Sequence, residues 1–82
     1  MNILKYVVST KKIPVIFSKE ITHSDVMADA ISAGFLVVKF DVNYRKFIVK
    51  CFGESSSLNL KNGDEDEYLI ENYLNSKFHN FV

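Results

Sequence analysis

The chain has 82 residues, of which 48% are hydrophobic and 24% charged, and its formal net charge at pH 7 is zero. This length and composition are typical of one globular domain spanning residues 1–82. The zero net charge disfavours nucleic acid as a partner, since such binders normally carry a basic excess. No apolar run approaches the ~20 residues that a membrane-spanning helix needs, so no membrane partner is expected.

The charges are unevenly distributed along the chain. Residues 1–50 hold eight Lys and Arg against four Asp and Glu, whereas residues 51–82 hold two against six. The two halves either pair internally and are otherwise solvated, or the basic face of one molecule meets the acidic helix of another. The single cysteine, Cys51, excludes an internal disulfide and favours a reducing compartment. The N-terminus lacks the features of a signal peptide, so we expect a cytoplasmic location.

The first two predicted elements are strands that form a hairpin. Residues 3–9 and 13–18 are rich in β-branched and aromatic side chains, and a polar turn separates them. Pro14 has no backbone N–H to donate to a ladder, so the second strand is expected at the edge of the sheet.

A short helix is predicted to start at His23. Thr22 and Asp25 have the spacing of a capping box, and Ile21 and Val26 occupy the positions of a hydrophobic staple. The helix is at most about two turns long, so packing rather than intrinsic propensity must stabilise it.

Residues 31–42 and 46–52 show the clearest strand pattern, joined by a tight turn at Asn43 and Tyr44. Alternating side chains leave one face of this hairpin wholly apolar, and that face is the predicted core. The opposite face is charged near the turn and apolar near Phe35 and Phe52. The register set by the turn pairs Asp41 with Lys46, Phe40 with Phe47, Val38 with Val49 and Leu36 with Cys51.

The last predicted element is a helix over residues 64–82, after a turn at Asn62 and Gly63. Its acidic first turn favourably meets the positive end of the helix dipole. Its apolar stripe consists of Ile70, Tyr73, Leu74, Phe78 and Phe81. The order β-β-α-β-β-α predicts an α+β domain: two antiparallel hairpins, a short helix between them and a C-terminal helix, with the helices packed on the sheet.

The segment CFGESSSLNL at 51–60 contains the most polar corner of the chain. It lacks the second glycine of the G-x-S-x-G elbow of serine hydrolases and the Lys of a phosphate-binding loop. We expect a structural corner in which Gly53 takes unusual backbone angles, followed by a short strand bearing Leu58 and Leu60. The alternative is a polar binding surface built from the serines.

No metal or cofactor is expected, because His23, His79 and Cys51 lack the paired spacing of a zinc site. A ligand site is nevertheless conceivable if the fold brings His23 and Glu54 together as an acid–base pair. Its candidate residues are His23, Ser32, Gly53, Glu54, Ser55 and Ser57. The candidate interface residues are the aromatic side chains Phe35, Phe52, Phe78 and Phe81.

Two short motifs, SAGF at 32–35 and GES-x-SL at 53–58, together with HSDV at 23–26, resemble stretches of small bacterial and prophage-encoded proteins of unknown function. The resemblance implies a mobile-element accessory protein and brings no chemistry with it.

The sequence therefore favours a small, non-enzymatic protein-interaction module that binds itself or another protein. One alternative is a ligand-binding or enzymatic site formed by His23, Glu54 and the nearby serines. Another is nucleic-acid binding through the basic residues Lys11, Lys12, Lys39, Arg45, Lys46 and Lys50.

Overall fold

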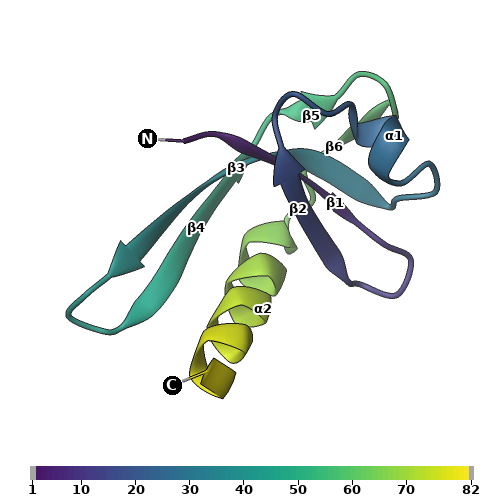
Figure 1. Ribbon diagram of the computed structural model, residues 1–82. Coiled ribbons are helices and arrows are strands. Elements are labelled where there is room, and N and C mark those ends of the chain that lie inside the picture. The colour runs from purple at the N-terminus through teal and green to yellow at the C-terminus, as the bar shows by residue number, and fades with distance from the viewer. Residues whose placement is uncertain (1, 82) are drawn as a thin grey trace.

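The computed structural model describes residues 2–81, with side chains for residues 2–77 (Figure 1). The predicted α+β order is confirmed, and the polar corner contributes a second, two-stranded sheet. The candidate interface residues Phe78 and Phe81 lie outside the described side chains. In chain order the elements are β1 (Leu4–Val8), β2 (Pro14–Ser18), α1 (His23–Val26), β3 (Ser32–Asp41), β4 (Lys46–Phe52), β5 (Glu54–Ser55), β6 (Leu60–Lys61) and α2 (Asp66–Phe81).

The main sheet has four antiparallel strands in the order β2-β1-β3-β4. The strand that begins with Pro14 is an edge strand, as predicted. The register of β3 with β4 is also confirmed, with Asp41 opposite Lys46 and Leu36 opposite Cys51. The alternating pattern specifies this register strongly, because a slip of one residue would turn every core side chain to the other face.

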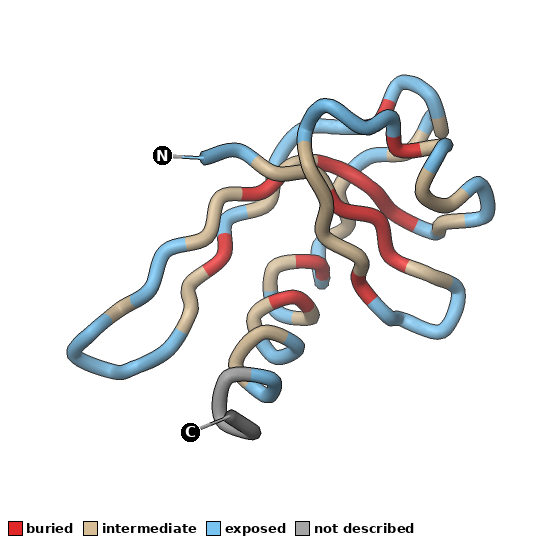
Figure 2. The backbone as a smooth tube through the Cα atoms, in the orientation of Figure 1, coloured by how far each residue is buried: buried red, intermediate tan, exposed pale blue. Residues whose placement is uncertain are grey.

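The core lies between the sheet and α2, which crosses one face of it (Figures 1 and 2). Its buried members are Tyr6, Val8, Leu36, Val49 and Ile70. Tyr73, predicted to belong to the apolar stripe, is instead 38% exposed. The prediction was wrong because the face of α2 turned to the sheet also carries Glu67 and Glu71, which rotates it away from Tyr73. No helix within residues 2–81 is both long enough and apolar enough to cross a membrane.

The opposite face of the sheet is partly covered by α1 and the segment around it. The α1 helix starts at His23, as predicted, but the capping box does not form, since Thr22 makes no side-chain cap bond. The Asp25 carboxylate is too short and too exposed for that role, and the Asp25 N–H instead donates to the Thr22 carbonyl at 3.0 Å. Packing therefore holds this single turn of helix.

Candidate functional site

His23 is a buried packing residue. Only 3% of its surface is exposed, and its Nε2 lies 2.8 Å from the Gly34 carbonyl oxygen. The imidazole meets the rings of Phe17 and Phe35 edge to face, with centroids 5.6 and 5.5 Å away. This environment fixes α1 against β3 and leaves the ring no open approach for a substrate.

The polar corner at residues 53–57 ties α1 to the small sheet. Gly53 has φ +74°, and a Cβ at this position would lie 3.0 Å from Cδ2 of Phe35. Ser55 is 1% exposed, and its Oγ accepts the Leu58 N–H at 3.2 Å. Ser57 Oγ accepts the N–H of Ser24 in α1, also at 3.2 Å. The Ser55 hydroxyl thus bonds a local backbone donor, and the Ser57 hydroxyl bonds one from α1.

The predicted strand bearing Leu58 and Leu60 is only partly correct. β6 starts at Leu60, whereas Leu58 lies in the turn that precedes it. Asn59 has φ +55° within this turn. A residue in the left-handed backbone region cannot belong to an extended strand, so Leu58 and Leu60 do not form the continuous strand that their alternation predicted.

Ser32 and Glu54 make no hydrogen bond with His23 among the described residues. They line a shared hollow of about 480 Å³ between the start of β3 and the β5–β6 pair. Glu54 is exposed and stands opposite Lys61 in the small sheet, whereas His23 is enclosed by two phenylalanine rings. His23 and Glu54, the two residues of the conceivable acid–base pair, therefore lie in different environments.

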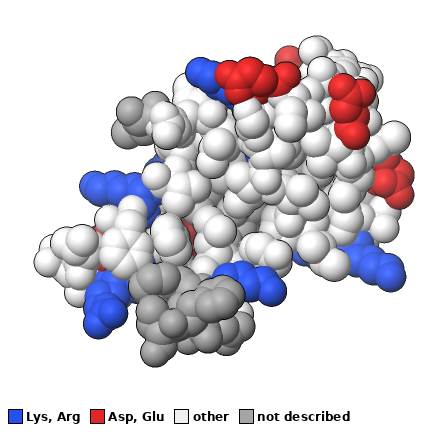
Figure 3. Space-filling view, in the orientation of Figure 1, with Lys and Arg blue, Asp and Glu red and all other residues white. Residues whose placement is uncertain are grey.

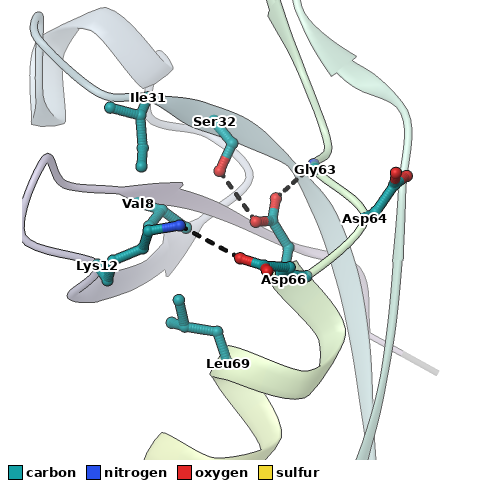
Figure 4. A pocket seen from close by; sticks show the side chains of 9 residues that line it. Val8, Lys12, Ile31, Ser32, Gly63, Asp64, Asp66 and Leu69 are labelled. Atoms are coloured by element: carbon teal, nitrogen blue, oxygen red, sulfur yellow. Dashed lines mark hydrogen bonds and ion pairs between the residues drawn. The ribbon is translucent and has the colours of Figure 1, made fainter.

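A buried carboxylate at the start of α2 is the polar centre of the molecule. Asp66 is 4% exposed, and its Oδ1 accepts the Ser32 hydroxyl at 3.0 Å. Its Oδ2 accepts the Tyr6 hydroxyl. The same oxygen accepts the Gly63 N–H at 2.7 Å (Figure 4). The bond from the Gly63 N–H joins Asp66, the first residue of α2, to the turn that precedes the helix. Asp66 thereby ties α2 to β1 and β3.

Burial changes the acidity of two groups beside this carboxylate. It raises the pKa of the Tyr6 hydroxyl well above its ordinary value, and the hydrogen bond to Asp66 raises it further. It also raises the pKa of the Cys51 thiol to about 12, with the Asp66 carboxylate adding to the effect. Both groups are therefore protonated at neutral pH, which makes Cys51 a poor nucleophile.

Above Asp66 the surface is hollowed over about 430 Å³ (Figure 4). Lys12 and Glu65 join across this hollow in an exposed ion pair of 3.2 Å. Asp66 forms its floor, but both of its oxygens already have donors. Every buried side-chain polar atom in the described residues has a partner, and those residues contain no cluster of three metal-ligating side chains. The hollow thus presents no unpartnered buried group for catalysis.

The side chains of α2 bind the outer edge of β4. Glu67 Oε1 accepts the Cys51 N–H, and Glu71 Oε2 accepts the Val49 N–H, both at 2.9 Å. Asn75 makes two bonds to the same backbone unit, accepting the Phe47 N–H at 2.7 Å and donating to the Phe47 carbonyl at 3.2 Å. These three side chains, which we call the α2 ladder, occupy the donors that an edge strand otherwise presents to other chains.

The spacing of the α2 ladder follows from elementary geometry. Four helical residues rise about 6.0 Å, and two residues of an antiparallel strand span about 6.8 Å. A helix antiparallel to a strand can therefore match every fourth side chain to every second backbone N–H. This site is not predicted above, although Glu67, Glu71 and Asn75 show the i, i+4, i+8 spacing in the sequence.

The other edge strand, β2, has no such cover. In an antiparallel sheet, successive residues of a strand direct their backbone N–H and C=O groups alternately to the strand on one side and to the strand on the other. Because the N–H groups of residues 47, 49 and 51 in β4 point away from β3, the register of each strand pair determines which residues of β3, β1 and β2 bond which neighbour. In the observed registers, Val15 and Phe17 bond β1, and Pro14, Ile16 and Ser18 point outward. Within residues 2–81, no helix or loop accepts the N–H of Ile16 or Ser18.

Comparison of the chain with protein-family models, curated proteins and solved structures finds no match.

Proposed function

We propose that the chain is a small, non-enzymatic, cytoplasmic interaction module that self-associates by pairing the β2 edges of two copies. One observation carries this proposal: the α2 ladder closes the β4 edge, whereas the β2 edge is open. An open edge presents unpaired backbone groups, which are a template for strand addition.

The backbone groups of β2 that point away from β1 are self-complementary. A twofold axis at Ile16 pairs this residue with Ile16 of the second copy, and Pro14 with Ser18. The two Ile16 residues exchange two bonds, and each Ser18 N–H donates to the opposite Pro14 carbonyl. The Ser18 carbonyl faces a proline that has no N–H, but it already accepts the Ile21 N–H at 3.1 Å. The missing donor thus lies opposite an acceptor that is already bonded.

The expected association is weak. Each backbone bond contributes a net ~0.5–1.5 kcal/mol, while association costs at least ~4 kcal/mol in lost rigid-body freedom. Ile13 and Ile21 flank β2 and are 50% and 44% exposed, so they supply additional apolar area. We expect a dimer with a dissociation constant between about 1 μM and 1 mM.

The ligand-site alternative has less support. His23 Nε2 lies within hydrogen-bond distance of a backbone carbonyl, and the Ser55 and Ser57 hydroxyls bond backbone N–H groups within the chain. Sites for catalysis generally retain groups that are poised or unpartnered, and these are neither.

Sedimentation equilibrium from micromolar to millimolar concentration tests the proposal with two matched pairs of variants. Ser18→Pro and Ser18→Ala both remove the hydroxyl, but only the proline removes the outward N–H. Ile16→Pro and Ile16→Ala differ in the same way at the twofold axis. We expect each proline variant to dissociate at concentrations where its alanine counterpart is dimeric. Thermal melts confirm that each variant is folded.

A parent protein that stays monomeric at millimolar concentration would refute the proposal. Dimers that persist in a folded Ser18→Pro variant would place the interface elsewhere.

A further inference from the structure

The β3–β4 hairpin has a second face, which points away from α2. The register places Val37 opposite Lys50, Lys39 opposite Ile48, and Phe35 opposite Phe52. We call this surface the hairpin face. Lys39, Lys46 and Lys50 are exposed, Phe52 is 41% exposed, and Val37 and Ile48 are half-buried. His23 covers only the Phe35 end of it.

The hairpin face is basic although the chain is neutral. Lys39 lies across from Ile48, and Lys46 and Lys50 lie two residues to either side of it. Within β3 and β4, Asp41 supplies the carboxylate on this face. It accepts the N–H groups of the turn residues Asn43 and Tyr44 at 2.9 and 3.2 Å.

The two strands of the hairpin carry more lysines than carboxylates on this face. In Figure 3 blue side chains lie beside the hairpin at the lower left, with others at the top, bottom and right, and most of the visible red side chains lie at the top and right. Glu67 and Glu71 lie at the β4 edge, where the Cys51 and Val49 N–H groups bind their carboxylates. On the hairpin face itself, Lys39, Lys46 and Lys50 outnumber the single carboxylate of Asp41.

Aromatic rings accompany these lysines at both ends of the hairpin. Phe52 stacks on Phe35 with centroids 5.9 Å apart and planes inclined by 22°. Tyr44 is 76% exposed in the turn, and Lys46 Nζ lies 5.8 Å from its ring centroid, which places this ring beside the hairpin face. At Phe35, Lys5 Nζ lies 5.8 Å from the ring centroid. From Lys46 to Phe52, β4 spans about 20 Å, and Tyr44 lies in the turn that precedes this strand.

We propose that the hairpin face binds single-stranded nucleic acid, with Lys39, Lys46 and Lys50 contacting phosphates and the rings of Tyr44 and Phe52 stacking on bases. A basic surface with aromatic rings is how proteins hold unpaired strands without reading their sequence. A duplex is disfavoured because its bases are already stacked on both sides. The hairpin lies at the opposite end of the sheet from β2, so this inference does not depend on self-association.

Fluorescence anisotropy with a labelled 12-nucleotide oligothymidine measures the binding directly. We expect dissociation constants of ~10⁻⁶–10⁻⁴ M, and a 12-base-pair duplex should bind more weakly. Three or four phosphate contacts predict a salt slope of about −2 to −3, which is an affinity loss of about 20- to 50-fold between 50 and 200 mM salt.

Two pairs of variants separate this site from general charge attraction. Lys46→Gln with Lys50→Gln should weaken binding at least about tenfold at 50 mM salt. Lys11→Gln with Lys12→Gln removes equal charge from the β1–β2 turn and should leave it nearly unchanged. Tyr44→Ala should weaken binding at least about fivefold through lost stacking, whereas Tyr68→Ala, which removes an equally exposed ring from α2, should not.

The proposal is overturned if the oligothymidine does not bind at 50 mM salt. It is also overturned if the duplex or heparin competes equally well and Tyr44→Ala has no effect, because the surface would then be a polyanion patch without stacking.

Discussion

The two edge strands of the sheet, β4 and β2, differ in whether their outward backbone groups are hydrogen-bonded within the chain. At β4, α2 runs beside the strand and its Glu67, Glu71 and Asn75 side chains take the outward N–H groups. At β2, Pro14 removes one donor and the Ile21 N–H occupies one acceptor, but Ile16 remains open. The closed edge confines β4 to this chain, whereas the open edge leaves β2 free to pair with another.

Asp66→Ala is expected to lower the stability of the fold, and with it the position of α2 beside β4, more than any other substitution considered. Without the carboxylate, the Tyr6 and Ser32 hydroxyls and the Gly63 N–H lose their acceptor. Hydrogen bonds to a charged group contribute ~1.5–3 kcal/mol each, so we expect at least about 3 kcal/mol of lost stability in urea unfolding. A loss below 1 kcal/mol would mean that Asp66 does not position α2.

The next largest loss of stability is expected from Glu71→Leu. This substitution keeps the bulk of the side chain but removes the acceptor of the Val49 N–H. Leaving that buried donor unsatisfied should cost about 1–3 kcal/mol. The variant should also self-associate more strongly, because the β4 edge is opened. Glu65→Leu is the matched control, since Glu65 is exposed and, among the described residues, its carboxylate pairs with Lys12. Equal unfolding midpoints for the two variants would contradict the role of the α2 ladder.

Sequence patterns predicted the strands but not the relation between β4 and α2. The β3–β4 register followed from local alternation and a short turn. The bond from Glu71 to Val49 joins residues 22 positions apart, and nothing local specifies that the helix will lie along that edge. The role of Asp66 could not be predicted either, because it is one of four consecutive acidic residues that all suit the first turn of a helix. Only its tertiary contacts with Tyr6 and Ser32 distinguish it from the other three.

A smaller effect is expected from Gly53→Ala, which follows the end of β4 and is not bonded by the α2 ladder. The backbone at φ +74° disfavours any Cβ, and the new methyl group would meet the Phe35 ring at 3.0 Å. We expect a loss of about 1–2 kcal/mol in thermal or urea unfolding, with the dimerisation constant unchanged. A neutral or stabilised variant would show that the corner at residues 53–57 is not strained.

The last expected effect, confined to alkaline pH, is a pH dependence at Cys51. Its pKa is about 12 in the folded chain against an ordinary 9.0, so the folded state retains a proton that the unfolded state releases. This contribution to stability is complete below pH 9 and is lost between pH 9 and 12, at no more than ~1.4 kcal/mol per pH unit. Urea unfolding of the parent and of Cys51→Ala should give a stability difference that changes in this window. A constant difference would contradict the shift.

Amide hydrogen exchange followed by NMR tests the difference between the two edges most directly. The Val49 and Cys51 amides should be protected at every protein concentration, because the α2 ladder belongs to the same chain. The Ile16 and Ser18 amides should exchange rapidly at low micromolar concentration and become protected as the concentration approaches millimolar. Protection of Ile16 and Ser18 that is independent of concentration, or rapid exchange of Val49 and Cys51, would contradict the assignment of one closed and one open edge.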